Sequence, residues 1–447
     1  MSDLPTGWAV AAISDVAEVI AGQAPPGESY NKVSDGMPLF QGKTDFGDLY
    51  LGAPRLWTTA PSRVASKDDV LVSVRAPVGP TNLAPQACAI GRGLAAIRGG
   101  TGISQHYLLY AMRSSVWQLE NKATGTTFAA ITTPVLRAHP IPVAPTAEQE
   151  RIVAAIEEEF SRLDAGAAAL ERVRQSLKRL RGAILDQIAS PPRGLNNPRM
   201  SAGAWPREPL GGLVADRGGI VDGPFGSNLK SSHYTDSGPR VIRLQNIGDG
   251  EFVDARAHIS EAHFQSLRRH DVQPGDLVCA ILGEVLPRVV LVPDQLGPAI
   301  VKADCPRIRL SPHMNPRYVW AVLNAPSTRE QTSLAIRGVG RPRLTVKALR
   351  AIMIPAPPRD VQDAIVAHMD TSLAEVSRVE RAVSRALSMQ ERLRSGILGA
   401  AFSGRLVSQD PGNEPASVLL GRIAADRPSF NGDKPSRTRK PPRKANA

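Results

Sequence analysis

The sequence holds fragments of catalytic and ligand-binding motifs, and each fragment is incomplete. Gly42-Lys43-Thr44 matches the end of a phosphate-binding loop, but that loop requires a glycine five positions before Gly42, where Met37 stands. Glu120-Asn121-Lys122 has the E-x-K spacing that ends many metal-dependent nuclease sites, but it lacks a suitable acidic partner upstream. We therefore expect neither a nucleotide-binding loop nor a nuclease centre.

Residues that could hold a metal or act as nucleophiles are scattered along the chain. His258, His263 and His270 have five- and seven-residue spacings that do not share a helix face well, and no H-E-x-x-H occurs. The three cysteines are far apart and form no C-x-x-C. The nucleophile motif G-x-S-x-G and the tetrads N-P-P-Y and D-P-P-Y of amino-methyltransferases are absent from the sequence. We expect a non-catalytic protein without a metal or cofactor of its own.

The composition is typical of a folded protein that binds a partner. The chain has 447 residues, enough for about three structural units, and 42% of them are hydrophobic. No run of 18 apolar residues occurs, and the first residues lack the basic and apolar regions of a secretion signal. We expect a soluble cytoplasmic protein, and the net charge of +12 points to a polyanionic partner.

The elements that must position any binding residue form an internal repeat. Residues 141–145 (IPVAP) recur as residues 354–358 (IPAPP), and Gln149 recurs as Gln362, at a constant offset of 213 residues. Further pairs at this offset are Gly125 and Gly338, Thr132 and Thr345, Leu136-Arg137 and Leu349-Arg350, and Ile184-Leu185 and Ile397-Leu398. The chain therefore has two halves, each ending in a constrained segment.

Each constrained segment continues into a heptad pattern without proline, which predicts long helices over residues 146–188 and 359–407. The residues expected to pack these helices follow a seven-residue spacing: Ile156, Leu163, Leu170, Leu177 and Ile184 in the first, then Met369, Val376, Val383 and Ile397 in the second, where Gln390 interrupts the series. Flanking positions in the same stripes are Ile152, Val173 and Leu180, then Ile365, Val379 and Leu393. Two matching stripes favour packing of the helices on each other; an amphipathic helix lying on its own domain is the alternative.

The parts before the helices, residues 1–145 and 205–358, show the pattern of mixed α/β domains. Strand-like runs cover residues 69–74, 276–281, 288–292 and 299–301, and helical patterns cover residues 105–119 and 316–323. Between the halves, residues 189–204 form a Pro- and Gly-containing linker. Residues 408–447 lose any pattern and end in a basic segment, so we expect a disordered basic tail.

Together these features resemble the DNA-specificity subunits of Type I restriction–modification systems. The resemblance rests on Leu4-Pro5-Thr6-Gly7-Trp8, on residues 87–93 (ACAIGRG), on residues 141–153 with their second copy, and on residues 397–406 (ILGAAFSGRL). It covers about residues 4–407. The second copy departs from the family at Asp360-Val361-Gln362, where glutamate usually precedes the glutamine, and the basic tail lies outside the family pattern.

The resemblance implies two target-recognition domains, residues 1–145 and 205–358, separated by an antiparallel coiled coil in a pseudo-two-fold arrangement. Each domain would read one half of a bipartite site in double-stranded DNA. The helices would set the gap between the halves and dock two modification (methyltransferase) subunits, and two restriction (ATP-dependent motor–nuclease) subunits would complete the complex. S-adenosylmethionine, ATP and Mg would belong to those partners. The alternatives are the recognition part of a fused restriction or methyltransferase enzyme and a coiled-coil scaffold protein.

The DNA contacts are expected from side chains that can pair with base edges or phosphates. Arg and Lys suit guanine, and Asn and Gln suit adenine. The candidates are Lys43, Arg75 and Arg92 in the first half and Lys230, Arg243, Gln245, Asn246, Arg341 and Arg343 in the second. Residues 1–145 carry 11 basic and 10 acidic side chains, against 21 and 14 in residues 189–358. We therefore expect the second domain to hold phosphates more strongly and to be more sensitive to salt.

Overall fold

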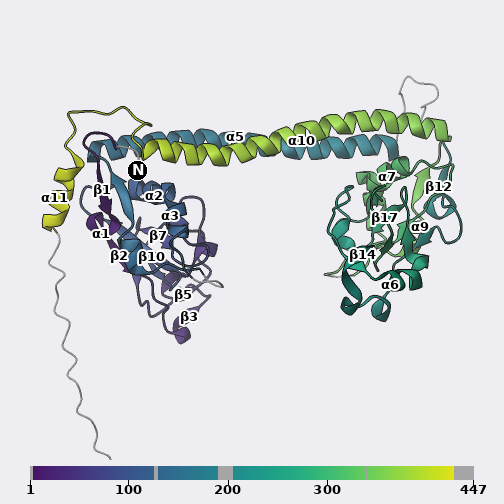
Figure 1. The fold of residues 1–447 in the computed structure, drawn as a ribbon, viewed down its shortest axis with the longest axis horizontal. Helices are drawn as coiled ribbons and strands as arrows, with labels where there is room; N and C mark the ends of the chain where they lie inside the picture. The colour runs from purple at the N-terminus through teal and green to yellow at the C-terminus, as the bar shows by residue number, and fades with distance from the viewer. Residues whose placement is uncertain (1–3, 125–128, 190–204, 339, 427–447) are drawn as a thin grey trace, which may run out of the picture. The chain divides into compact units, whose positions relative to one another are not determined.

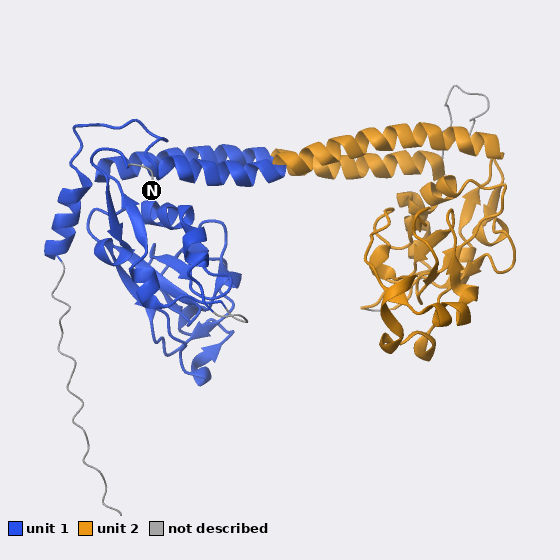
Figure 2. Cartoon of the chain, in the orientation of Figure 1, with its two compact units in different colours: residues 1–168, 387–447 blue, residues 169–386 orange. Residues whose placement is uncertain are grey.

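The computed structural model describes residues 4–124, 129–189, 205–338 and 340–426. The chain divides into two compact units (Figure 2): unit 1 consists of residues 1–168 and 387–447, and unit 2 of residues 169–386. Each unit contains a globular part of short strands and helices and a share of two long helices (Figure 1). This confirms the predicted mixed α/β class with two globular parts and long helices.

Unit 1 is built around a four-stranded antiparallel sheet. Its strands, in spatial order, are β2 (Ala17–Ala21), β10 (Leu94–Gly99), β7 (Val70–Ser73) and β8 (Thr81–Leu83). On β7, Val70 and Val72 belong to the core that also holds α2 (Gln105–Ser114), whereas Leu71 belongs to a second core. Because both faces of β7 are buried, its sequence is an unbroken apolar run rather than an alternating one.

The second core of unit 1 lies against a five-stranded sheet. Its order is β3 (Tyr30–Asn31), β5 (Trp57–Thr58), β4 (Met37–Phe40), β9 (Cys88–Ile90) and β6 (Val64–Ala65). Strands β4 and β9 are parallel, and their neighbours are antiparallel. The remaining strands and short helices of unit 1 are β1 (Ala9–Ala12), paired with β11 (Pro140–Val143), and α1 (Ile13–Val16), α3 (Val116–Glu120) and α4 (Thr133–Arg137).

Unit 2 repeats this topology. Its antiparallel sheet has the order β13 (Ile220–Val221), β20 (Arg307–Ile308), β17 (Leu277–Ala280) and β18 (Arg288–Leu291). Its second sheet has the order β15 (His258–Ile259), β14 (Tyr234–Ile242), β19 (Ala299–Val301) and β16 (Asp271–Val272), with a parallel β14–β19 pair in place of β4–β9. The other elements are β12 (Arg207–Pro209), paired with β21 (Met353–Pro355), and α6 (Glu261–Ser266), α7 (Pro316–Asn324), α8 (Pro326–Ser333) and α9 (Val346–Arg350). The predicted strands and helices of both halves are confirmed within a few residues.

The long helices α5 (Thr146–Ala189) and α10 (Arg359–Ala401) run antiparallel and side by side (Figure 1). In unit 1 the first part of α5 contacts the last part of α10, where Gln390 Nε2 donates to the Leu163 carbonyl at 2.9 Å. In unit 2 the last part of α5 lies against the first part of α10, and Leu185 and Met369 share one core. Helix α10 ends six residues before the predicted residue 407, because Gly404 adopts a left-handed conformation with φ of 72° that no helix continues.

Helix α11 (Ala416–Asp426) corrects the prediction that residues 408–447 lack structure. Its apolar positions Ala416, Leu419 and Ile423 are buried in the core of unit 1, beside α1. They recur with the spacing of one helix face, and this burial stabilises a helix too short to persist alone. The basic residues 427–447 and the linker residues 190–204 lie outside the described part of the chain.

Two glutamines, repeated at the offset of 213 residues, fasten each long helix to its globular part. In unit 1, Gln149 on α5 accepts from the Ser104 amide at 3.1 Å and donates to the Ala144 carbonyl at 2.9 Å. In unit 2, Gln362 on α10 accepts from the Asn315 amide at 2.8 Å and donates to the Pro357 carbonyl at 2.8 Å. The repeat in the sequence is therefore a repeat of tertiary contacts.

Candidate DNA interface

Two predicted contact residues of unit 1 lie together at one end of the antiparallel sheet. Arg75 follows β7 and Arg92 precedes β10. Because Ser73 pairs with Leu94 in the antiparallel register, the two arginines flank the same end. Both side chains are exposed.

Lys43 is exposed and begins a short 3-10 turn, Lys43–Asp45. The Asp45 carboxylate accepts from the amides of Gln41 at 2.7 Å and Gly42 at 3.3 Å. An acidic side chain therefore occupies the amides that a phosphate-binding loop would offer to a phosphate. This agrees with the expectation that Gly42-Lys43-Thr44 is not a nucleotide site.

The corresponding end of the sheet in unit 2 carries Arg343. The backbone of Arg343 bridges to Leu282, as Ala130 bridges to Arg75 in unit 1. Arg343 Nη2 lies 2.6 Å from Asp304 Oδ1 and 4.0 Å from Asp222 Oδ2, and the guanidinium lies 5.7 Å from the centre of the Phe225 ring. Burial raises the pKa of Asp222, and the nearby Asp304 carboxylate raises it further. The positive charge of Arg343 is thus compensated within the protein.

The Arg243-Leu244-Gln245-Asn246 segment offers fewer free groups than its sequence predicts. Asn246 is 1% exposed, and its Nδ2 donates to the carbonyls of Val253 and Ala255, both at 2.8 Å. Its Oδ1 accepts from the Arg243 amide at 2.9 Å. Asn246 therefore holds this turn in shape and has no amide hydrogen left for a base, whereas Gln245 beside it is exposed.

Two other predicted residues of unit 2 are exposed on loops. Lys230 precedes a 3-10 turn, Ser231–His233, and Arg341 lies between Gly338 and Arg343. Neither has an ion pair among the described residues. Their placement leaves both free to meet a partner.

Tyr234 and Lys302 join this surface although the sequence patterns gave no reason to select them. The Lys302 ammonium lies 5.6 Å, and the Arg243 guanidinium 5.9 Å, from the centre of the Tyr234 ring. The two cations are the residues that directly follow β14 and β19, which are adjacent parallel strands. Only the strand register could have revealed the pairing, because about 60 residues separate Arg243 and Lys302 in sequence.

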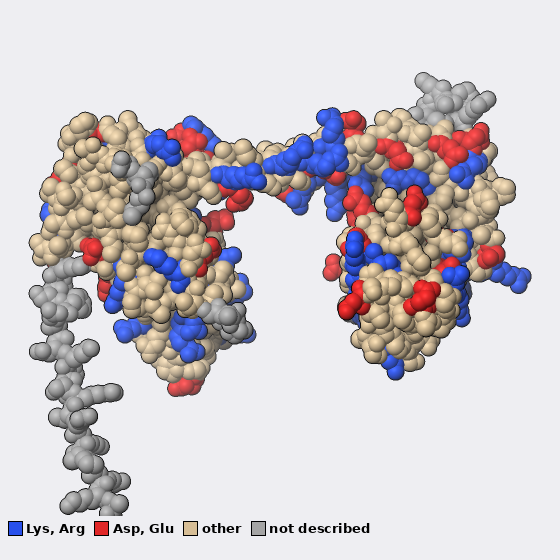
Figure 3. Space-filling model, viewed as in Figure 1, with Lys and Arg blue, Asp and Glu red and all other residues tan. Residues whose placement is uncertain are grey.

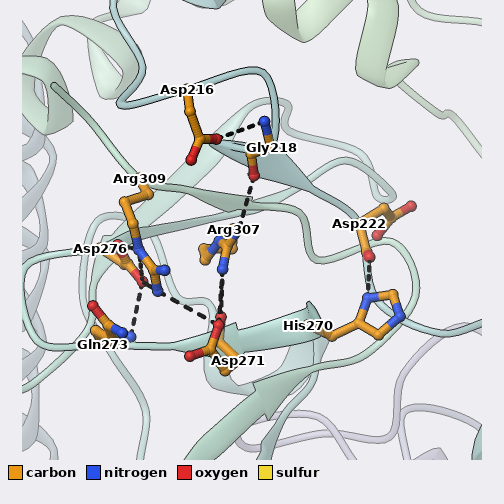
Figure 4. A network of polar contacts seen from close by, with 9 residues as sticks. All are labelled: Asp216, Gly218, Asp222, His270, Asp271, Gln273, Asp276, Arg307 and Arg309. Atoms are coloured by element: carbon orange, nitrogen blue, oxygen red, sulfur yellow. Dashed lines mark hydrogen bonds and ion pairs between the residues drawn. The ribbon is translucent and has the colours of Figure 1, made fainter. Parts of the chain in front are cut away.

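A network of partly buried polar contacts links strands of the two sheets of unit 2 (Figure 4). Arg309 Nε and Nη2 donate to the two Asp276 carboxylate oxygens at 2.9 and 2.7 Å. Arg307, which is 5% exposed, donates to the Asp271 carbonyl and carboxylate, both at 3.0 Å, and to the Gly218 carbonyl at 2.8 Å. Burial lowers the pKa of Arg307, whereas the hydrogen bonds that Arg309 donates to Asp276 raise the pKa of Arg309.

The same aspartate–arginine pair occurs in unit 1. Arg98 Nε and Nη2 donate to the Asp69 carboxylate at 3.0 and 2.8 Å. Asp69 also accepts from the Ser66 amide at 2.7 Å, as Asp276 does from the Gln273 amide at 2.8 Å. The aspartates that open the two similar strands are therefore structural and do not face a ligand.

The heptad residues of the long helices are all at least partly buried. Ile156, Leu177, Met369, Val376 and Val383 are buried, and the residues of intermediate exposure are Leu163, Leu170, Ile184 and Ile397. The flanking residues Val173, Leu180 and Leu393 are 42%, 50% and 45% exposed. The expectation that these three residues extend the buried apolar stripe of the helices is therefore wrong. Two helices bury a narrow seam, which is why the flank remains outside.

The described residues contain no group of three or more His, Cys, Asp or Glu that could hold a metal ion. Cys88, Cys279 and Cys305 are all buried as free thiols, and burial raises the pKa of each, to about 12 for Cys88. A thiol with a raised pKa is a poor nucleophile at neutral pH. No helix in the described ranges is both long and apolar enough to cross a membrane.

Charge by itself does not mark the interface. On the face shown in Figure 3, basic and acidic side chains are interspersed over both units. The candidate interface is defined by loops at the strand ends and by the cations that these loops carry.

The chain is similar to known proteins that share one description. Residues 5–175 match the Type I restriction modification DNA specificity domain. The specificity subunits of the Type I restriction enzymes EcoKI (Escherichia coli K12) and StySPI (Salmonella potsdam) are 25% and 24% identical, each over 97% of this chain and 98% of their own length. The MjaX specificity subunit of Methanocaldococcus jannaschii is 37% identical, but the chain spans only 36% of its length.

A solved structure from work on the assembly of the type I R-M system has the same fold, with a TM-score of 0.66 at 20% identity over 91% of this chain and 100% of that one. Residues 5–175 thus carry the match to the DNA specificity domain, and almost the whole chain is similar to specificity subunits of Type I restriction enzymes. The predicted resemblance is confirmed, and the proteins that the chain matches are specificity subunits, which supports the expectation of a non-catalytic chain. The alternatives of a fused enzyme and a scaffold find no support in these matches.

Proposed function

We propose that this chain directs a Type I restriction–modification complex to a bipartite site in double-stranded DNA, with each unit reading one half of the site. The observation that carries the proposal is the repeat of one sheet topology, with loops of exposed cations at the strand ends, in both units. Domains of the same fold but different surface residues suit the recognition of two different half-sites. The complex would act in the cytoplasm.

The helices α5 and α10 would set the gap between the half-sites and dock two modification subunits, and two restriction subunits would complete the assembly. S-adenosylmethionine, ATP and Mg would bind to those partners. Helix α5 has 44 residues and α10 has 43, and both run without a break from one unit into the other. A continuous helix pair is stiff enough to act as a spacer.

Methylome sequencing of the host with and without this gene tests the proposal. We expect a split motif with methylated adenines to disappear on deletion, and to return when the chain is supplied together with its modification subunits. If every methylated motif persists after deletion, the chain does not direct methylation and the proposal is wrong.

An insertion tests the spacer. Seven extra residues in both α5 and α10, inserted after residues 168 and 386, keep the heptad phase and lengthen each helix by about 10.5 Å. The methylated motif should then keep its two halves but gain about three base pairs in the gap, at 3.4 Å per pair. The control is a seven-residue insertion between α10 and α11, which should leave the gap unchanged. An unchanged gap in the helix variant would refute the spacer.

A further inference from the structure

Arg75 and Arg92 line a cleft at one end of the antiparallel sheet of unit 1. The cleft has a volume of about 460 Å³ and lies between the strand ends, the Ala21-Gly22 turn and the start of α4. The turn is packed so closely that a Cβ on Gly22 would lie 2.2 Å from the Gly91 carbonyl oxygen. Glycine at this position lets the backbone form the wall of the cleft.

Among the described residues that line this cleft, the two arginines are the only charged ones, and the others are apolar or small, with hydroxyls from Thr132 and Thr133. Both guanidinium groups are exposed, and neither forms an ion pair or hydrogen bond with any described residue. The carboxylates of Glu18 and Asp69 are engaged by Arg98, which lies at the far end of β10. The cleft is therefore a place of uncompensated positive charge in a domain whose net charge is close to zero.

The same end of the sheet in unit 2 is built differently. There the cation is Arg343, in the segment whose backbone bridges Arg337 to Arg343. Asp304 and Asp222 neutralise its charge. The Phe225 ring covers the guanidinium from another side. Two units with one topology thus present an open positive cleft in one case and an ion-paired arginine in the other.

We infer that the cleft of Arg75 and Arg92 holds a backbone phosphate of the bound DNA, so that it anchors unit 1 on its half-site. The inference rests on the proposed function. Guanidinium groups bind phosphate oxygens in a planar, bidentate manner, and an arginine without an internal partner loses no ion pair on binding. The described lining residues offer two cations and two hydroxyls but no carboxylate or amide side chain, which suits an anion better than the mixed donors and acceptors of a base edge.

The test compares Arg75→Ala/Arg92→Ala with the wild-type chain, each co-expressed with its modification subunits and assayed as the complex. Equilibrium binding is measured between 50 and 200 mM salt on a duplex with the recognised site and on one with a scrambled site. Each phosphate contact contributes about 0.9 to the slope of log K against log salt, which is about a 3.5-fold change in affinity over this range. The double variant should lose at least that slope, equally on both duplexes.

Two further variants make the test specific. Arg75→Lys/Arg92→Lys keeps the charge and should keep most of the slope. Lys67→Ala removes an exposed cation before β7, at the opposite end of the strand from Arg75, and should change the slope by less. Thermal unfolding checks that each variant folds.

The outcomes separate the sources of failure. An unchanged slope in a folded double variant would overturn the inference, as would a loss confined to one base pair of the half-site, because that would mark base reading. Inorganic phosphate as a competitor distinguishes the DNA backbone from a free anion. If millimolar phosphate binds in the wild-type cleft but leaves DNA binding unchanged, the inference would also be overturned. If the wild-type complex shows no preference for any site, the proposed function itself fails.

Discussion

His139 makes the stability of unit 1 depend on pH. The residue is 0% exposed, its Nε2 lies 2.8 Å from the Ser115 hydroxyl, and its Nδ1 has no partner among the described residues. Burial, with a smaller contribution from Lys122, lowers its pKa from 6.5 to about 4. The folded state therefore keeps a neutral imidazole where the unfolded state takes up a proton.

The sign and size of the effect follow from this difference. The contribution of His139 to stability is complete above pH 6.5 and is lost as the pH falls from there toward 4. At pH 5 the two pKa values correspond to a loss of about 2 kcal/mol, or about 30-fold in the unfolding equilibrium.

The assay is urea unfolding at pH 7.5 and 5.0, followed by hydrogen exchange of peptides from α2 and β11 in unit 1. Gln at position 139 stays neutral and can still hydrogen-bond to Ser115, so His139→Gln should reduce the loss between the two pH values by about 2 kcal/mol relative to the wild-type chain. His313→Gln, at an exposed histidine of unit 2, leaves the buried imidazole in place and serves as the control. If His139→Gln and the wild-type chain lose equal stability, the buried neutral imidazole is not the cause.

Three further substitutions test the packing described above. Leu419→Ala in α11 should cost unit 1 about 2–4 kcal/mol, because the side chain is 2% exposed, whereas Val418→Ala, at 46% exposure, should stay within about 0.5 kcal/mol; hydrogen exchange of unit 1 measures both, and equal effects would refute the docking of α11. Gln362→Ala should cost unit 2 about 1–3 kcal/mol in urea unfolding, because the Asn315 amide and a carbonyl lose their partner; a cost no larger than that of Val418→Ala would contradict the anchoring role. Asp276→Asn should cost about 1–3 kcal/mol in the same assay, because the paired guanidinium loses its counter-charge, and an unchanged midpoint would show that the network of Figure 4 is dispensable.

The repeat made most of the fold predictable. Residues at a fixed offset, such as Gln149 and Gln362, occupy equivalent positions because they perform the same contact in both units. Helix α11 was missed, although Ala416, Leu419 and Ile423 have helical spacing, because Gly421 interrupts an already short pattern and residues 408–415 before the helix are polar, Gly or Pro. Its stability comes from burial against a surface that is distant in sequence.

The candidate interface was less predictable than the fold. Asn246 was selected by residue type, but its amide side chain hydrogen-bonds to the backbone of its own turn. The residue type alone does not show whether an asparagine side chain binds the backbone or a ligand. The free arginines of unit 1 and the paired Arg343 of unit 2 have the same chemistry in sequence. Strand register decides which of them meets a carboxylate, and register depends on contacts between distant segments.

The division of the chain also has a consequence for its synthesis on the ribosome. Unit 2 is one continuous stretch, residues 169–386, whereas the core of unit 1 includes Leu398, Phe402 and Leu419 from the far end of the chain. The Tyr107 ring meets Phe402 with centroids 5.2 Å apart, a contact that must wait for almost the whole chain to be made. The globular part of unit 1 is thus translated first, but its core is completed last. Until then it exposes the apolar face that α10 and α11 later cover, so the nascent chain is most prone to aggregation there.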